Sequence, residues 1–189
     1  MGSYRKKLFL LLVWFFIFPL VGLAQTKPFE LKSPVFDNGG IIPKTFTCDG
    51  RNISPPLYWV NPPPDTKSFV LIMHDPDAPS GDFTHWVVYD IPSDLRGLPR
   101  AFPRLPEVKG IKQGYNSFGY IGYGGPCPPP WDGYHHYYFE LYALDVKTLG
   151  LPPAVKREEV EKAMKGHILG KAVLVGLYKR ERFFFFSLK

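Results

Sequence analysis

Two loops rich in proline and glycine constrain the fold of this chain most strongly. The first follows an apolar stretch at residues 68–74 and begins with Asp-Pro-Asp-Ala-Pro at residues 75–79, and the second covers residues 120–134. Proline fixes φ and lacks a backbone N–H, and glycine admits positive φ, so these loops interrupt regular structure. Each loop leads into an apolar strand that opens near a histidine, His85 or His135. The pattern predicts a mainly β domain in which stiff loops present polar side chains at strand ends.

Alternation of apolar and polar residues predicts the strands on either side of these loops. At residues 68–74 it places a row of apolar side chains, continued by Asp75, on one face and His74 on the other. Residues 171–178 are apolar on both faces, which predicts a central strand that is covered on both sides. We also expect strands at residues 29–36, late in 46–59, and at 84–91 and 134–144, with helical spacing only at 155–168.

The N-terminus has the pattern of an export segment. Three basic residues at 5–7 precede an uncharged apolar run at 8–24, and Gly22 and Ala24 are small residues of the kind that signal peptidase accepts. The run is also barely long enough to span about 30 Å of hydrocarbon, so an uncleaved membrane anchor is the alternative. In both cases the basic flank stays inside and the domain, residues 25–189, faces outward, in the periplasm or outside the cell.

The charge of the chain argues against a nucleic-acid partner. Residues 1–24 contain three of the 23 Lys and Arg and none of the 17 Asp and Glu, so the remaining chain has a formal net charge of only +3. Its basic residues do not form one stripe interleaved with aromatic residues. With 45% hydrophobic residues, the chain can bury a substantial core as a single domain.

The two cysteines, Cys48 and Cys127, allow one disulfide in an exported chain. Such a bond would tie an early loop to the second glycine-rich loop. The alternative is a pair of small buried thiols, because bridging requires Cα atoms closer than about 7 Å.

The motifs together resemble the phosphatidylethanolamine-binding protein family, also called the Raf kinase inhibitor protein family. The resemblance rests on the stretches DPDAP, THWVVYDIP, GYGGPCPPP and YALD in this order, and FTCDGRNISPPLYW is similar to the prokaryotic branch. It covers about residues 28–179 and leaves out the export segment and a C-terminal tail at 180–189. The family implies a large central antiparallel sheet, a smaller sheet, and one or two short helices near the C-terminus.

The resemblance also implies a small anion pocket for phosphate-type groups, including phospholipid head groups. Carried over by position, the pocket residues are Asp75, Pro79, His85, Tyr123, Gly125, His135 and Tyr137. The family usually has Arg after the second histidine, where this chain has His136, and alternation turns that position away from the pocket.

These residue types suit an oxyanion ligand. Two imidazoles, a tyrosine hydroxyl and the backbone N–H groups of a glycine-rich loop would supply inward-directed donors. Asp75 would repel an anion unless it orients a histidine and holds its proton, or accepts from the ammonium of an ethanolamine head group. The first use raises an imidazole pKa and strengthens anion binding in mild acid.

Two classes of function remain. The first is a binding protein without catalytic activity or cofactor, which also inhibits or regulates a protein partner, because family members inhibit kinases or serine proteases. The second is an extracytoplasmic hydrolase that uses Asp75, His85 and His135 as metal ligands or as acid and base. The sequence contains neither HExxH nor GxSxG, which favours the binding protein.

The tail carries four consecutive phenylalanines, Phe183, Phe184, Phe185 and Phe186. Exposed aromatic clusters are costly without a partner. We expect this segment to pack on the domain or a sheet edge, or else to contact a membrane surface.

Overall fold

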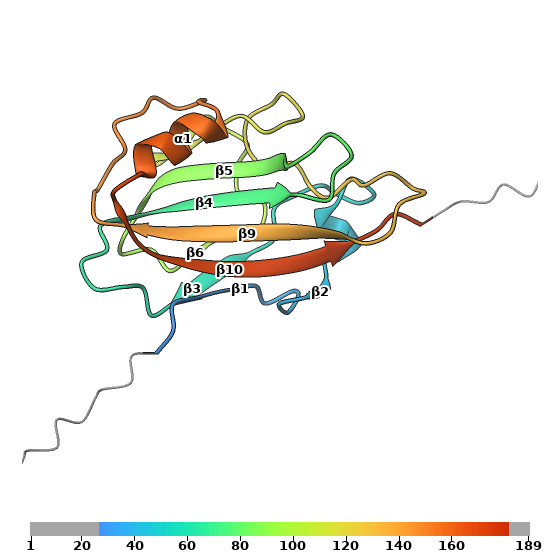
Figure 1. The fold of residues 1–189 in the computed structure, drawn as a ribbon, viewed down its shortest axis with the longest axis horizontal. Coiled ribbons are helices and arrows are strands. Elements are labelled where there is room, and N and C mark those ends of the chain that lie inside the picture. The colour runs from blue at the N-terminus through green and yellow to red at the C-terminus, as the bar shows by residue number, and fades with distance from the viewer. Residues whose placement is uncertain (1–26, 182–189) are drawn as a thin grey trace, which may run out of the picture.

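The computed structural model describes residues 27–181 of the chain. The expected export segment or anchor and the four phenylalanines of the tail lie outside these residues. Within them, the chain forms two β-sheets and one α-helix (Figure 1). No helix in this part of the chain is long and apolar enough to cross a membrane.

The larger sheet has seven strands in the order β2-β10-β9-β4-β5-β8-β7. Their bounds are β2 Gly40–Ile41, β4 Ser68–Asp75, β5 Phe83–Pro92, β7 Glu107–Val108, β8 Ile111–Gln113, β9 His135–Leu144 and β10 Ile168–Tyr178. All neighbouring pairs are antiparallel except β2 and β10, which are parallel. The expected large antiparallel sheet is therefore present, with one parallel strand at its edge.

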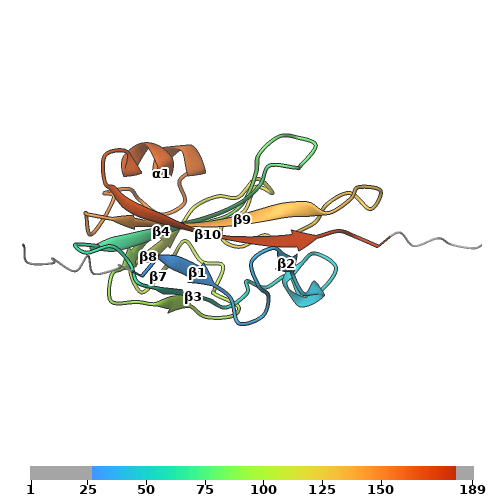
Figure 2. The same ribbon diagram turned by 60° about the horizontal axis from the view of Figure 1, so that its bottom comes forward.

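The smaller sheet has three strands in the order β1-β3-β6, with bounds Glu30–Lys32, Leu57–Val60 and Gly97–Leu98. It packs against one face of the large sheet, and the helix α1, Arg157–Met164, covers part of the opposite face (Figure 2). A short 3-10 helix, η1 Lys44–Phe46, precedes β3. The structure thus has one α-helix near the C-terminus, within the range that the family resemblance implies.

Strand alternation builds two apolar layers. From β4, Phe69, Leu71 and Met73 enter the core between the sheets, and Val70 and Ile72 enter the layer beneath α1. All five are completely buried, and each large apolar side chain contributes roughly 1.5–3 kcal/mol by leaving water. The centre of the large sheet is therefore covered on both faces.

The helix is shorter than the predicted 155–168. Its buried residues Val160 and Met164 are four positions apart, and the Glu159 carboxylate accepts the backbone N–H of Lys156 at the N-terminus (3.1 Å). Gly166 adopts a positive φ of 85° just after the helix, a conformation that ends it, and β10 begins at Ile168.

Strand β10 corrects the expectation of a central strand that is covered on both faces. It lies next to the edge strand β2, and only one of its faces is buried. Leu174 is 2% exposed but Val173 is 38% exposed. Val173, Val175 and Leu177 are apolar, but the face of β10 that they share is not fully buried. The apolar run therefore did not indicate a strand covered on both faces. The first strand is also shorter than expected, Glu30–Lys32 rather than 29–36.

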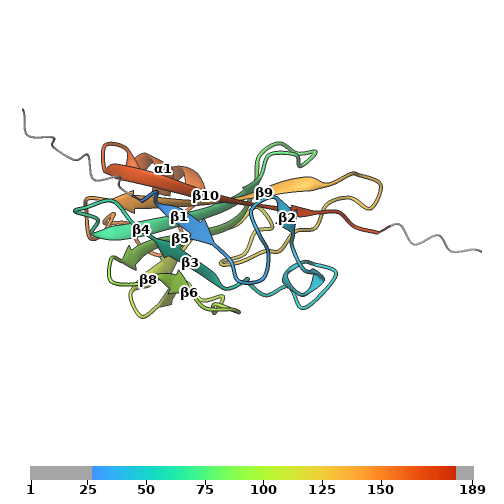
Figure 3. The same cartoon turned by 90° about the horizontal axis from the view of Figure 1, so that it is seen from below.

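The ends of three adjacent strands meet at one end of the large sheet. Because β9, β4 and β5 are antiparallel neighbours, the last residues of β4 lie beside the first residues of β5 and β9. The loop after β4 and the loop before β9 extend from this same end (Figures 1 and 3). The two proline- and glycine-rich loops of the sequence are thus brought together.

Candidate functional site

A pocket of about 190 Å³ opens to solvent at this end of the large sheet. Its wall combines ionisable side chains from the strand ends with apolar side chains from the loops. The lining residues are Asp75, Ala78, Pro79, Ser80, Phe83, His85, Phe118, Cys127, Pro128, Pro129 and His135. Water occupies about 30 Å³ per molecule in the liquid. The space therefore suits a small polar group such as a phosphate.

Asp75 and His135 form a buried pair in this wall. The His135 Nδ1 donates to Asp75 Oδ2 (2.8 Å), and the backbone N–H of Asp77 donates to Asp75 Oδ1 (2.9 Å). Both residues are 3% exposed. Each oxygen of the Asp75 carboxylate thus has a donor, and the aspartate orients the imidazole, as one of its two expected uses requires.

The pair favours a protonated His135. Burial alone would lower the pKa of His135, but hydrogen bonds to Asp75 and Asp132 and the charges of both carboxylates raise it above its ordinary value. The second ring nitrogen, Nε2, lies 3.4 Å from the exposed Asp132 carboxylate. This contact is long, so a ligand oxygen can replace it as the partner of Nε2–H.

The surroundings of His85 favour a neutral imidazole, in contrast to the protonated His135. Its Nδ1 lies 2.7 Å from the carbonyl oxygen of Gly124, which can only accept, so Nδ1 carries a proton. Burial lowers the pKa of His85 to about 4, and the Gly124 carbonyl and the Asp75 charge offset this only in part. At neutral pH the ring is therefore neutral and Nε2 holds a lone pair. Of the two imidazoles that line the pocket, only His135 can therefore donate through Nε2 in this state.

Two backbone N–H groups of the glycine-rich loop form hydrogen bonds within the protein and so are not available to a ligand. The Gly124 N–H donates to the His85 carbonyl (2.8 Å), and the Gly125 N–H donates to Asn52 Oδ1 (2.8 Å). A Cβ at Gly125 would lie 2.4 Å from the Phe46 carbonyl oxygen. Glycine is thus needed here for close packing of the loop, and these two N–H groups are not the expected anion donors.

The two tyrosines carried over from the resemblance, Tyr123 and Tyr137, are buried and do not line the pocket. Tyr123 donates its hydroxyl to the Phe46 carbonyl (2.6 Å) and packs edge-on against Trp86. Tyr137 packs edge-on against His85, with ring centroids 5.2 Å apart. Tyr123, Gly125 and Tyr137 do not line the pocket, whereas Asp75, Pro79, His85 and His135 do.

The hydroxyl of Tyr137 is buried and makes no hydrogen bond within residues 27–181. Burial raises its pKa far above the usual range, and the nearby Asp75 carboxylate raises it further. Tyr137 therefore stays protonated, and its ring packs against those of His85 and His135, with centroids 5.2 and 6.5 Å away.

A disulfide between Cys48 and Cys127 fixes the proline-rich wall. Their Cα atoms are 5.3 Å apart, and the Cys48 N–H donates to the Pro126 carbonyl (3.0 Å). The bond joins the turn after η1 to a residue that lines the pocket. Of the two alternatives for the cysteines, the structure thus shows the bonded pair.

The sequence analysis did not identify several residues that line the pocket. Phe83 and Phe118 pack edge to face with ring centroids 4.7 Å apart and close the apolar side, and Pro128 and Pro129 face the same pocket. Pro128 and Pro129 lie in the second loop already identified and Phe83 directly follows the first, whereas Phe118 lies just before the second loop. Asp132, three residues before His135, was a further acidic candidate.

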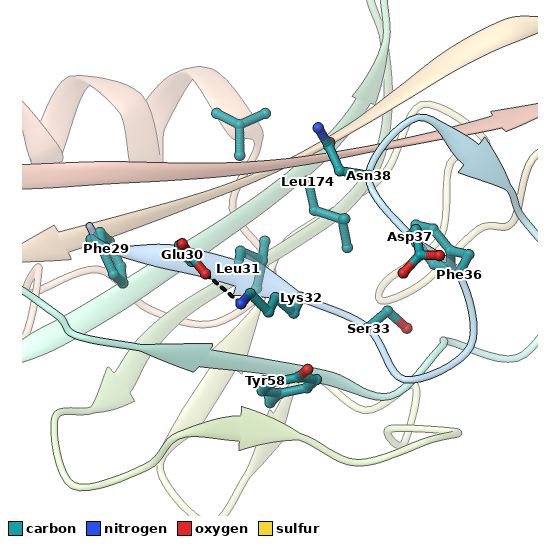
Figure 4. Close-up of a pocket in the computed structure, with 11 residues that line it drawn as sticks. Phe29, Glu30, Leu31, Lys32, Ser33, Phe36, Asp37, Asn38, Tyr58 and Leu174 are labelled. Carbon is teal, nitrogen blue, oxygen red and sulfur yellow. Dashed lines mark ion pairs between the residues drawn. The ribbon is translucent and has the colours of Figure 1, made fainter. Parts of the chain in front are cut away.

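A larger hollow of about 530 Å³ lies between β1 and β10 (Figure 4). Several of its polar side chains are bonded to one another or to the backbone: Lys32 pairs with Glu30, Ser33 donates to the Pro56 carbonyl (2.8 Å), and Asn38 accepts the Val175 N–H (2.8 Å). None of the described residues that line it is a histidine. Size alone therefore does not make it the better candidate.

The comparisons with known proteins agree with this architecture. The family model described as phosphatidylethanolamine-binding protein matches residues 32–179. The chain belongs to the phosphatidylethanolamine-binding protein family. Among its relatives, a UPF0098 protein from Aquifex aeolicus (strain VF5) is 60% identical over 152 residues, which are 80% of this chain and 89% of the relative.

Two solved structures have the same fold. A putative phosphatidylethanolamine-binding protein homologue from Chlamydia trachomatis D/UW-3/CX is 40% identical, with a TM-score of 0.73 over 81% of this chain and 98% of that chain. YbcL from E. coli, described as a member of the mammalian PEBP family, is 31% identical, with a TM-score of 0.75 over 81% of this chain and 99% of that chain. The fold and the family that the sequence motifs indicated are both confirmed.

Proposed function

We propose that this protein is a binding protein without catalytic activity that holds a phosphate-type oxyanion, either free or as a phospholipid head group. The observation that carries the proposal is the convergence of Asp75, His85 and His135 from β4, β5 and β9 on one small open pocket. The family membership supports a binder rather than a catalyst.

The charge balance of the pocket supports binding of a singly charged group. Protonated His135 carries one positive charge, and the buried Asp75 compensates it while directing Nε2–H away from itself. A bound oxyanion would displace Asp132, which is half in solvent, and take over that donor. The apolar wall of Phe83, Phe118 and Pro128 strengthens this contact, because it lowers the local dielectric.

Calorimetric titration with inorganic phosphate at pH 6 tests this function. We expect binding by the wild type and at least a tenfold loss in His135→Gln, since glutamine cannot supply a charged donor. His167→Gln is the matched control, because His167 pairs with Asp145 away from the pocket. No binding by the wild type, or equal binding by His135→Gln, would refute the proposal.

The hydrolase alternative predicts turnover rather than stable binding. Incubation with a phosphate monoester should leave the ester intact if the protein only binds it. Release of phosphate at a rate that falls in both His135→Gln and Asp75→Asn would instead favour the hydrolase.

We also propose that the protein works outside the cytoplasm. The sequence of residues 1–24 supports export, and the Cys48–Cys127 disulfide is of a kind that persists in oxidising compartments. N-terminal sequencing of protein from its own cells should begin at Gln25 if the segment is cleaved. An intact N-terminus in the membrane fraction would favour the anchor.

A further inference from the structure

We propose that the pocket selects oxyanions that carry a hydrogen-bond donor of their own, and that the Nε2 lone pair of His85 is the specificity-determining group that receives this donor. The inference rests on the proposed function and adds the class of ligand. A fully deprotonated oxyanion without a donor, such as sulfate, offers only acceptors and leaves this nitrogen unpaired.

The tautomer of His85 follows from its position. A carbonyl oxygen cannot donate, so the 2.7 Å contact between Nδ1 and the Gly124 carbonyl assigns the proton to Nδ1. The Gly124 carbonyl is itself fixed, because the N–H of the same residue donates to the His85 carbonyl (2.8 Å). This reciprocal pair of bonds locks the ring against β5, and Nε2 is the one polar ring atom left to face a ligand.

The surroundings keep His85 from taking a second proton. Its ring lies between Phe83, Phe118 and Tyr137, with centroid distances of 5.2, 5.4 and 5.2 Å. The titratable groups that act on its pKa are Asp75 at the end of β4 and His74 on the other face of β4, and Tyr137 on β9 packs against the ring. The Gly125 carbonyl is a second backbone acceptor near the ring. The Asp75 charge is already used by His135 and Asp77, so burial prevails and the ring stays neutral.

The two histidines thus offer opposite functions to one small ligand. His135 offers a donor through Nε2–H and His85 offers an acceptor through Nε2, and both line the same pocket. An oxyanion with one deprotonated oxygen and one donor satisfies both. A ligand without the donor leaves the lone pair unmatched, and an unpaired polar atom in a buried site weakens binding.

Two chemical sources can supply the donor. One is a P–OH group, which a phosphate monoester retains until its second pKa of about 6 and which inorganic phosphate retains above that pH. The other is the ammonium of an ethanolamine head group, next to a phosphodiester that has no P–OH. The experiment separates them with two matched ligand pairs: inorganic phosphate against sulfate, and glycerophosphoethanolamine against glycerophosphocholine, whose quaternary ammonium has no N–H.

Calorimetry of the full-length protein with these four probes at pH 6.5 tests the inference. We expect the donor-bearing member of at least one pair to bind tenfold or more tightly than its partner, and the pair that shows this identifies the source of the donor. In His85→Phe, which retains the aromatic packing and removes the lone pair, the ratio should fall to within about threefold. The wild-type ratios are informative without the variant if His85→Phe does not fold.

The outcomes are distinct. Equal affinities within both pairs would overturn this inference while leaving the proposed oxyanion function in place. A wild-type preference that persists in folded His85→Phe would also overturn it, because another group would then be the acceptor. Failure of all four probes to bind would refute the proposed function and this inference with it.

Discussion

The two faces of the sheet at the end of β4 carry similar residues but differ in what they can do. His74 and Asp75 are neighbours in sequence and face opposite sides. On the helix side, His74 contacts Asp82 (2.5 Å) and lies 3.9 Å from Glu140. On the pocket side, Asp75 holds His135, and His85 stands beside them.

The difference lies in how the charges are used. On the helix side, Asp82 also pairs with Arg157 (2.8 Å) and Glu140 pairs with Lys171 (2.9 Å), so opposite charges satisfy one another. On the pocket side, no charged side chain among residues 27–181 is hydrogen-bonded to His85, and the remaining wall is largely apolar. The first arrangement is a partly buried ion-pair network, with His74 and Glu140 only 12% and 14% exposed, and the second places polar atoms in the wall of an open pocket.

The disulfide provides the largest test, because it constrains only the pocket side. Replacing both cysteines with Ser should lower the free energy of unfolding by roughly 4.5 kcal/mol in the chain-entropy model, given the 79-residue separation. Urea denaturation measures the loss. The wild type with reductant should approach the double variant, and the double variant should not respond to reductant. A loss below about 1 kcal/mol would mean that the pocket wall is held by its packing alone.

Acid should separate the two faces through their histidines. The folded-state pKa of His85 is about 4, below its unfolded value of 6.5, so the unfolded state binds the proton first and stability is lost as the pH falls from about 6.5 to about 4. At 1.36 kcal/mol per pH unit, the loss between pH 7 and pH 5 is about 2 kcal/mol. Denaturation at both pH values should show that His85→Phe lacks this loss.

His74 should show the opposite sign in the same experiment. Burial alone would lower its pKa, but the nearby Glu140 carboxylate and the hydrogen bond to Asp82 raise it above 6.5. Its contribution to stability is therefore complete below pH 6.5 and is lost as the pH rises through the raised value. If His74→Phe removed the acid loss instead of His85→Phe, the contrast between the faces would be wrong.

Removing a carboxylate from each face gives a smaller and more specific contrast. Asp75→Asn takes away the charge that favours protonated His135, so phosphate affinity at pH 6 should fall about tenfold, or 1.4 kcal/mol. Glu140→Gln on the helix face should leave phosphate affinity within about twofold. Titration calorimetry compares them, and an equal loss in both variants would show that the effect is not local to the pocket.

The smallest effect should come from the edge of the helix-side network. Lys171 is partly exposed and pairs with Glu140, and exposed ion pairs contribute about 0–1 kcal/mol. Lys171→Ala should therefore change the free energy of unfolding by less than about 1 kcal/mol and leave phosphate binding unchanged. A larger loss, seen by denaturation, would mean that the network supports the sheet more than its exposure indicates.

Much of the fold could be predicted because local patterns and family motifs agreed. Alternation in β4 placed Asp75 and His74 on opposite faces, which the structure confirms. The number of buried faces of β10 could not be predicted from its sequence. Runs of Val and Leu also occur in strands with only one buried face, as in β10.

The site shows a similar division. The sequence brought Asp75, His85 and His135 together through their positions at strand ends. It could not reveal that the Tyr123 hydroxyl donates a hydrogen bond to the Phe46 carbonyl. Nor could it reveal that the Gly124 carbonyl accepts a hydrogen bond from His85 Nδ1. These contacts join residues far apart in the chain, and they decide which atoms a ligand can reach.

The most direct test of the account is an NMR titration of the imidazole nitrogens with inorganic phosphate, with the histidines assigned by substitution. The account predicts that His85 keeps its proton on Nδ1, that His135 carries protons on both nitrogens at pH 6, and that phosphate shifts the signals of these two rings only. Unchanged His85 and His135 signals at saturating phosphate, or shifts confined to His74 and His136, would contradict it.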